Sequence, residues 1–451
     1  MNSRLLPILV LLCILFIMSC QPETEVSEEI PLQLDKELME TLITASPTGK
    51  FFHFILADEN KLEHLPNQDP RNPITREKVR LGKFLFFETG LAQDAKDSAC
   101  YETFSCASCH IPESGFLPGR IQGIADGAHG FGFQGSLREK LSIYEEADLD
   151  AQGVRPLTVL NVAYMTNTLW SGLFGAGHVN EGTEQLWDGP LAEVNHLGYT
   201  GLESQNIEGV KLHRLALNDH VLDDFGYRSL FDAAFPEVPV EERYSDEAIS
   251  FALGAYLRTI LTTRAPFQQW LKGDRSALTE NQKKGALLFF GKARCFRCHN
   301  SPALSGLTFH ALGTKDLYER GGLNTSDTDM RNQGRGMFTQ DQEDYYKFKV
   351  PQLYNLKDYK TFFHGSSKES LEEVLAFKMR ARSEKEQLKD SDLSSLFQPF
   401  DLTQSEQAQI LDFLKEGLYD RDYARFVPSE LPSGLCFPNN DQRSRNDLGC
   451  K

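Results

Sequence analysis

The pattern of hydrophobic and polar positions predicts several amphipathic helices and few strands. Within residues 246–259 the apolar positions recur at helical spacing, at Ile249, Leu253, Tyr256 and Leu257. Two further helix starts have a capping box, in which a Thr and a Glu or Gln three positions later satisfy each other's backbone N–H groups. These pairs are Thr279–Gln282 and Thr403–Glu406. Glycine-rich loops fill residues 115–135 and 172–182. The pattern therefore predicts a mainly α fold with long loops.

The N-terminus has the pattern of an export signal. Arg4 precedes an apolar stretch over residues 5–17, which is too short to span a bilayer comfortably, and a small residue then precedes Cys20. This arrangement resembles a bacterial lipoprotein signal, in which residues 1–19 are removed and Cys20 becomes lipidated. An ordinary signal peptide or an uncleaved anchor is the alternative. We expect an acidic tether over residues 20–48 and a place in the bacterial cell envelope, as a periplasmic or outer-membrane lipoprotein.

A weak internal repeat divides the rest of the chain. The apolar run 81–87 precedes the first C-x-x-C-H motif, and the apolar run 285–290 precedes the second. Self-similarity of this kind indicates two related units in tandem. We expect an N-terminal domain over residues 49–242 and a C-terminal domain with a tail over residues 243–451.

The sequence C-x-x-C-H is the attachment signature of c-type haem. Two thiols add to the haem vinyl groups, and the adjoining His lies against the iron as an axial ligand. One such motif could also be a redox dithiol or half of a zinc site, and a zinc ion could recruit both pairs. Two motifs in an exported chain favour two covalently bound haems. Their attachment residues are Cys106, Cys109 and His110 in the first half, and Cys295, Cys298 and His299 in the second.

The net charge and the remaining cysteines limit the kinds of partner and the disulfides that we expect. The 451 residues have a net charge of −17, which argues against a nucleic acid partner because phosphate binding needs clustered Lys and Arg. An acidic surface would suit a basic partner protein, although many such surfaces have no partner. Of the nine cysteines, Cys436 and Cys450 could form a disulfide in an oxidising compartment, and Cys100 would then be left over.

Three stretches together match a known family pattern over residues 80–415. They are residues 81–87 with the first C-x-x-C-H motif, residues 158–161 with Trp170-Ser171-Gly172, and residues 348–356 with Phe363-His364-Gly365-Ser366 and 371–374. The chain resembles the bacterial dihaem cytochrome c peroxidase family, which includes the dihaem maturation oxidase of methylamine dehydrogenase. The resemblance implies two tandem cytochrome c-like domains, each with a covalently attached haem, and joined by long loops.

The resemblance also assigns roles in the first half. The N-terminal haem would be the peroxidatic centre, the C-terminal haem would receive electrons, and Trp170 would lie between them. On the open side of the peroxidatic iron the family has a Gln, matched by Gln205, and a Glu whose sequence context is absent here. Glu208 and His213 are the nearest replacements. His129 would be the loop residue that blocks this iron in the resting state. Each of these residues could instead be an ordinary core or surface side chain.

In the second half the chain departs from the family. The family's Met or Tyr, the second axial ligand of the C-terminal haem, falls on Lys378, and Met379 follows it. A thioether raises the haem potential and an amine is normally protonated, so we expect Met379 as the ligand after a one-residue shift, with Lys378 as the alternative. His364 fits a Phe-His-Gly turn that is structural or supports the haem. Calcium between the domains stays open but is disfavoured, because Arg155 stands where an Asn ligand is expected.

These features together predict a lipid-tethered dihaem cytochrome c peroxidase. It would reduce hydrogen peroxide with electrons from a small c-type cytochrome or a copper protein (cupredoxin), and the lipid at Cys20 would supply its membrane contact. Two alternatives stay open, namely a dihaem oxidase that matures a partner protein and an electron-transfer cytochrome without a substrate site. The sequence does not identify the donor or the oligomeric state, so a homodimer also stays open.

Overall fold

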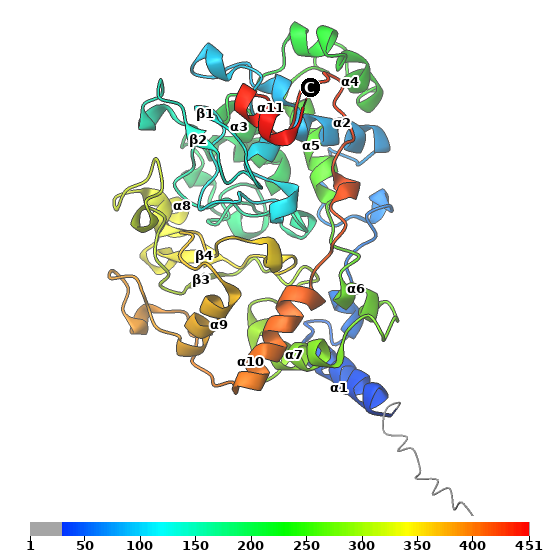
Figure 1. The fold of residues 1–451 in the computed structure, drawn as a ribbon, viewed down its shortest axis with the longest axis vertical. Coiled ribbons are helices and arrows are strands. Elements are labelled where there is room, and N and C mark those ends of the chain that lie inside the picture. Colours follow the sequence, from blue (N-terminus) through cyan, green and yellow to red (C-terminus); the bar gives the residue numbers. More distant parts are fainter. Residues whose placement is uncertain (1–28, 451) are drawn as a thin grey trace, which may run out of the picture.

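The computed structural model describes residues 29–450, so the predicted signal at residues 1–19 and the lipid site at Cys20 lie outside the described residues. Helices dominate this part of the chain, with short strands in two small sheets (Figure 1). None of the described helices is both long and apolar enough to cross a membrane. The prediction of a mainly α chain with long loops is confirmed.

The elements follow one another along the chain with long loops and short 3-10 turns between them. The α-helices are α1 (Glu29–Ala45), α2 (Arg76–Phe87), α3 (Gly201–Leu212), α4 (Arg228–Ala234), α5 (Asp246–Arg258), α6 (Pro266–Leu271), α7 (Glu280–Phe290), α8 (Gly336–Thr339), α9 (Leu371–Arg380), α10 (Gln404–Asp412) and α11 (Gln442–Leu448). The antiparallel strand pairs are β1 (Ala128–His129) with β2 (Glu139–Lys140), and β3 (Phe309–Ala311) with β4 (Lys347–Lys349).

The predicted helix starts form as capped N-termini. At α7 the Thr279 hydroxyl accepts a hydrogen bond from the Gln282 N–H at 3.2 Å, and the Gln282 side chain accepts one from the Thr279 N–H at 3.0 Å. Thr403 and Glu406 make the same reciprocal pair at α10. The two bonds satisfy N–H groups that have no partner inside the helix. Both capping boxes are confirmed.

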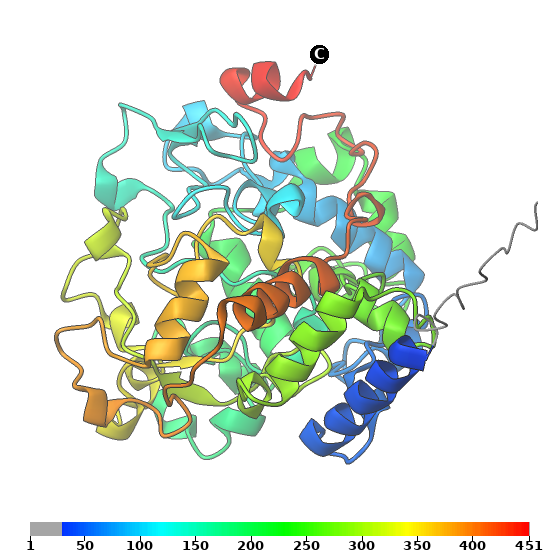
Figure 2. The same cartoon turned by 60° about the horizontal axis from the view of Figure 1, so that its bottom comes forward.

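The internal repeat is visible in how the helices cross. Gly82 of α2 lies against the backbone of α5, where a Cβ would overlap the carbonyl oxygen of Ala252. At the matching position of α7, a Cβ on Gly285 would overlap the carbonyl oxygen of Gln409 in α10. A glycine therefore lets the helix backbones approach closely in both halves. Figure 2 shows α7 and α10 lying side by side.

Two hydrophobic cores follow from these crossings. The first is built mainly from α2, α4 and α5, with Leu81, Phe86 and Tyr256 fully buried. The second is built from α1, α6, α7 and the end of α10, with Phe289 and Phe413 fully buried. The aromatic contacts repeat: the ring centroids of Phe86 and Tyr256 lie 5.5 Å apart, and those of Phe289 and Phe413 lie 5.8 Å apart. Each core thus packs against one of the two C-x-x-C-H motifs.

The N-terminal segment belongs to the second core. Leu38 and Leu42 of α1 are fully buried there, and Asp35 pairs with Lys283 of α7 at 2.7 Å. The indole N–H of Trp270 donates to the same carboxylate at 2.7 Å. Residues 29–45, which we expected within the acidic tether of residues 20–48, therefore form a packed helix, because apolar residues four positions apart share one face.

The C-terminal tail returns to the first core. It runs from α10 at one end of the molecule to α11 at the other (Figure 1). Phe426 and Leu431 are buried in the first core, and the side-chain amide of Asn439 donates to the Ser108 hydroxyl at 2.8 Å. A disulfide joins Cys436 to Cys450. With α5 also packed in the first core, the two cores do not follow the expected boundary between residues 242 and 243.

Candidate functional site

A cavity of about 310 Å³ lies in the first half, with the first C-x-x-C-H motif on its wall. Cys106 begins a 3-10 turn, and both thiols and the His110 ring line the cavity. The Nδ1 atom of His110 lies 3.1 Å from the carbonyl oxygen of Phe116, which leaves Nε2 for an iron. Histidines that ligate metals are commonly oriented in this way by a partner on the other ring nitrogen. The Phe86 ring packs 6.3 Å from this imidazole.

A second cavity of about 230 Å³ repeats the arrangement. Cys295, Cys298 and His299 lie on its wall, and the Nδ1 atom of His299 lies 2.8 Å from the carbonyl oxygen of Leu304. The Phe289 ring packs 6.4 Å from the imidazole. The two motifs therefore have matching surroundings, as two sites of the same kind would.

The surroundings of the thiols fit haem attachment better than the other uses of a C-x-x-C pair. Burial raises the pKa of Cys106, Cys109 and Cys295 to about 12, whereas a reactive dithiol needs a lowered thiol pKa. Between residues 29 and 450, no three His, Cys, Asp or Glu side chains converge as a metal-binding group, so the two pairs do not meet in a zinc site. Burial also lowers the pKa of His110 and His299 to about 4, which keeps both rings neutral and able to ligate.

The two cavities share a wall. Its residues, which line both cavities, are Arg155, Leu157, Thr158, Trp170, Lys349, Pro351 and Gln352. The Trp170 indole N–H donates to the Arg155 carbonyl oxygen at 2.7 Å, and the ring meets those of Phe348 and His364 edge-on. Trp170 thus lines both cavities, and its place between two haems stays a prediction of the resemblance.

Helix α3 forms another part of the first cavity's wall. Gln205 and Glu208 line the cavity, and His213 does so just after the helix. Gly209 of α3 also lines the cavity, and a Cβ at this position would meet only the His213 ring, at 4.0 Å. The His213 Nδ1 atom lies 2.7 Å from the carboxylate of Asp150.

Asp150 changes the chemistry of that histidine. Burial alone would lower the pKa of His213, but the buried Asp150 carboxylate holds this pKa above its ordinary value. Asp150 lies in an irregular loop far from His213 in sequence, and the sequence reasoning missed it. No pattern in the sequence pairs the two residues.

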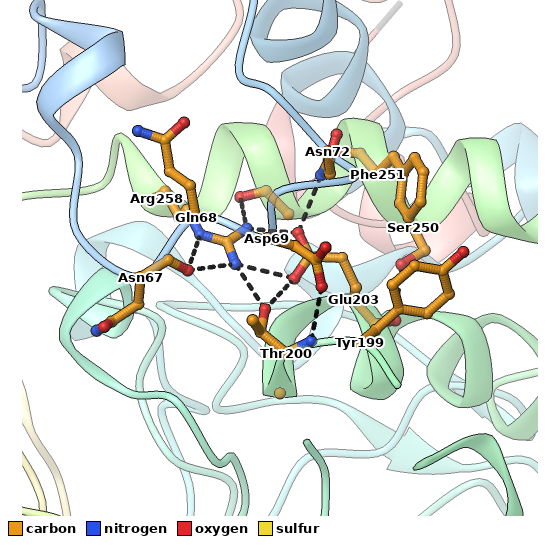
Figure 3. Close-up of polar contacts among 12 residues, drawn as sticks. Asn67, Gln68, Asp69, Asn72, Tyr199, Thr200, Glu203, Ser250, Phe251 and Arg258 are labelled. Carbon is orange, nitrogen blue, oxygen red and sulfur yellow. Dashed lines mark hydrogen bonds and ion pairs between the residues drawn. The ribbon is translucent and has the colours of Figure 1, made fainter. Parts of the chain in front are cut away.

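A buried ion pair fixes the position of α3. Arg258 at the end of α5 donates from both terminal nitrogens to the Glu203 carboxylate of α3, at 2.6 and 2.8 Å (Figure 3). The Asn72 side chain donates to the same carboxylate at 2.9 Å, and the Asn67 carbonyl oxygen accepts from Arg258. Although burial would raise the pKa of Glu203, Arg258 holds it below its ordinary value. Gln205 and Glu208 therefore project from a rigid helix.

Two predicted ligands lie away from the cavities. His129 sits in β1, paired with Glu139 of β2, and does not line either cavity. Met379 packs against the second core, while its neighbour Lys378 lines the second cavity. Leu371, Val374, Leu375 and Lys378 of α9 line this cavity, and Met379 is not among its lining residues. The structure therefore gives the facing position to Lys378, contrary to the expectation for Met379.

Lys378 is held among aromatic rings. Its ammonium lies 5.7 Å from the ring centroid of Phe363 and 5.2 Å from that of Phe397, and burial lowers its pKa. His310, which the sequence reasoning missed, also lines this cavity and lies 2.8 Å from the Ser394 hydroxyl through Nδ1. Lys378 and His310 thus place two nitrogen atoms on this wall besides those of His299.

The His364 side chain is buried and makes both a hydrogen bond and a stacking contact inside the protein. Its Nε2 atom lies 2.8 Å from the Asp316 carboxylate, which also pairs with Lys385. Its ring stacks on Phe348 with centroids 3.6 Å apart. These contacts fit the structural role that the sequence suggested for His364.

Comparison with known proteins agrees with this geometry. Residues 76–276 match the family model described as di-haem cytochrome c peroxidase. The methylamine utilization protein MauG of Methylorubrum extorquens is 28% identical over 348 residues, covering 76% of this chain and 79% of that protein. The cytochrome c551 peroxidase of Nitrosomonas europaea is 25% identical, covering 70% and 77% respectively.

A solved structure supports the fold. The crystal structure of a MauG-like protein associated with microbial copper homeostasis superposes with a TM-score of 0.57 at 24% identity. It covers 80% of this chain and 95% of that one. The resemblance that the sequence suggested is confirmed, and the chain is similar to bacterial di-haem cytochrome c peroxidases and MauG proteins.

Proposed function

We propose that the protein is a dihaem peroxidase of the bacterial cell envelope. It would reduce one hydrogen peroxide to two waters, with two protons and with two electrons from a small c-type cytochrome or a copper protein. The observation that carries this proposal is the pair of cavities, each with its own C-x-x-C-H motif, on either side of Trp170. Relatives named as cytochrome c peroxidases support it.

The residues present fit two covalent haems, one in each cytochrome c-like half. Cys106 and Cys109 would hold the first haem and His110 would bind its iron, and the second C-x-x-C-H motif would hold the other haem. When bound, the haems supply irons that accept electrons singly and react with peroxide. The chain's own task is to orient these groups, exclude bulk water and supply protons.

The wall formed by α3 suits proton handling in the first cavity. Reduction of peroxide needs a group that moves a proton between the two oxygens and a donor that steadies the leaving oxygen. The Gln205 amide can donate a hydrogen bond, and either Glu208 or His213 can move the proton. The Asp150 contact favours His213, because it fixes the ring through Nδ1 and leaves Nε2 toward the cavity. Glu208 also lines this cavity, and its carboxylate lies 3.8 Å from the Lys211 ammonium.

The second cavity suits an electron-receiving haem. Trp170 in the shared wall offers an aromatic path between the two sites. Besides His299, we propose that Lys378 would be the first candidate to bind the iron of the second haem and His310 the second. Since the amine must lose its proton to bind iron, the low dielectric of this cavity favours that step.

A second candidate function also has support. The MauG relatives favour a dihaem oxidase that modifies side chains of a partner protein, because such an enzyme uses the same pair of sites. The two functions differ in their reducing substrate. A peroxidase takes electrons from a small redox protein in solution, whereas a maturation oxidase takes them from its protein substrate.

One experiment tests the peroxidase proposal. The haem-loaded, half-reduced protein is mixed with reduced small cytochrome c and hydrogen peroxide, and oxidation of the cytochrome is followed by absorbance. We expect rapid turnover that is lost in His110→Gly and kept in His129→Ala, the matched histidine change outside both cavities. Absence of turnover with several cytochrome and copper-protein donors, in protein that contains both haems, would refute the proposal.

The envelope location is a separate proposal that rests on the sequence of residues 1–20. Labelled fatty acid should be incorporated into the wild-type protein and not into Cys20→Ala. Labelling of both proteins, or of neither, would contradict a lipid anchor at Cys20.

A further inference from the structure

The shared wall between the cavities is unusually cationic. Arg155 and Lys349 are 4% and 2% exposed and line both cavities. The described lining of the second cavity includes further cations but no Asp or Glu; these cations are Arg294, Lys378 and Lys385. This lining stands out because the chain as a whole has a net charge of −17.

The Arg155 side chain has no anionic partner among the described residues. Its backbone is fixed, since the N–H donates to the His364 carbonyl oxygen at 2.7 Å and the carbonyl oxygen accepts from Trp170. Its guanidinium, in contrast, makes no hydrogen bond or ion pair within residues 29–450, and the buried Nε atom is unsatisfied. The guanidinium carbon lies 5.2 Å from the centroid of the Tyr359 ring.

Among the buried arginines of residues 29–450, Arg138, Arg258 and Arg335 each donate hydrogen bonds from the guanidinium, which makes Arg155 an exception. Arg258 has the Glu203 carboxylate, and Arg335 donates to the Ser171 and Val179 carbonyl oxygens. Lys349 has one carbonyl partner, that of Asn167 at 2.6 Å, and no carboxylate. A buried cation without an anion is strongly unfavourable. The wall is therefore built for an anion that the polypeptide itself does not supply.

We propose that Arg155 binds the carboxylate side chains of both haems across the shared wall, with Lys349 as the second cation. A haem attached through its vinyl groups keeps two propionate carboxylates, so two haems would bring four. A guanidinium can pair with a carboxylate through two parallel hydrogen bonds, and its five N–H donors allow it to serve two carboxylates. A small free carboxylate or bicarbonate has the same chemistry and is the competing occupant.

This role would let one residue influence both irons. A positive charge near a haem favours the reduced state, because reduction adds an electron. Arg155 would thus raise the midpoint potentials of both haems together. The inference rests on the two haems of the proposed function, but it does not depend on reaction with peroxide.

The first test is a crystal structure of the haem-loaded wild-type protein grown without added carboxylate or bicarbonate. We expect the Arg155 guanidinium to lie about 2.8 Å from propionate oxygens of both haems, the usual length of a charge-assisted hydrogen bond. A guanidinium directed away from the haems, or bound to a free anion, would overturn the proposal.

The second test is a spectroelectrochemical titration of both haems in variants. Arg155→Gln should lower both midpoint potentials, and Arg155→Lys should restore part of the loss. The matched control is Arg425→Gln, because Arg425 pairs with Asp420 at 2.7 Å and lines neither cavity. The control should leave both potentials unchanged.

A shift of only one potential in Arg155→Gln, or equal shifts in the Arg425→Gln control, would contradict the shared role. Haem content is measured for every variant, so that loss of a haem is not read as a change of potential. If Arg155→Gln yields no haem-loaded protein, the wild-type crystal structure decides the question. Neither test measures peroxide turnover, so a failure of the peroxidase proposal can be distinguished from a failure of this one.

Discussion

The buried pair of Glu203 and Arg258 permits a quantitative prediction about stability. The Glu203 side chain is fully buried, and that of Arg258 is 2% exposed. Glu203→Gln keeps the size of the side chain but removes its charge, and it turns an amide donor toward the donors of Arg258. Breaking a buried ion pair by removing one partner costs about 3–5 kcal/mol. Since each 1.4 kcal/mol is about tenfold, the unfolded fraction should rise roughly a thousandfold.

Urea unfolding followed by far-ultraviolet circular dichroism measures this loss on haem-loaded protein. The control is Asp223→Asn, which removes a carboxylate from the exposed pair with Arg228, and whose effect should be small. The double variant Glu203→Gln with Arg258→Met should recover much of the stability, because no charge is then left buried alone. A loss below about 1 kcal/mol in Glu203→Gln would refute the view that this pair fixes α3.

The same pair predicts a pH dependence with a definite sign. The folded-state pKa of Glu203 lies below its ordinary value of 4.5, so the unfolded chain binds the proton more readily. The stability from this group is fully present above pH 4.5 and is lost as the pH falls through the folded-state pKa. The difference in unfolding free energy between wild type and Glu203→Gln should therefore shrink below pH 4.5. A difference that stays constant down to acid pH would contradict the assigned charge.

Three further predictions concern the cavities. Lys378→Met should change the absorption spectrum and raise the midpoint potential of the second haem, whereas Met379→Leu should leave both unchanged; the reverse result would make Met379 the ligand. Asp150→Asn should move the limb of the rate–pH profile that reports His213 to lower pH, because the Asp150 carboxylate raises that pKa; an unmoved limb would exclude His213 as the proton carrier. A calcium chelator should leave turnover and both potentials unchanged, because Arg155 already supplies a fixed positive charge; activity that is lost on chelation and restored by calcium would oppose this.

Several features were determined by sequence alone because they depend on local chemistry. The haem-attachment motifs need only two thiols and an imidazole within five consecutive residues. Each capping box, at Thr279 and at Thr403, joins two residues three positions apart, so its hydrogen bonds depend only on the local sequence at the helix start. The helical period over residues 246–259 and the repeat that surrounds Gly82 and Gly285 were equally readable. In each case the interacting atoms belong to one short stretch of chain.

Other features were decided only by tertiary structure, because their partners are far apart in sequence. Asp150 contacts His213 because a loop packs against the end of α3, and no pattern along the chain predicts that contact. Whether Lys378 or Met379 faces the second cavity depends on the rotation of α9 about its axis, which packing sets. Arg155 becomes notable only where two cavities meet and no carboxylate of the described chain reaches it. Long-range packing decides which side chains converge, and it therefore decides the chemistry that two local motifs can perform.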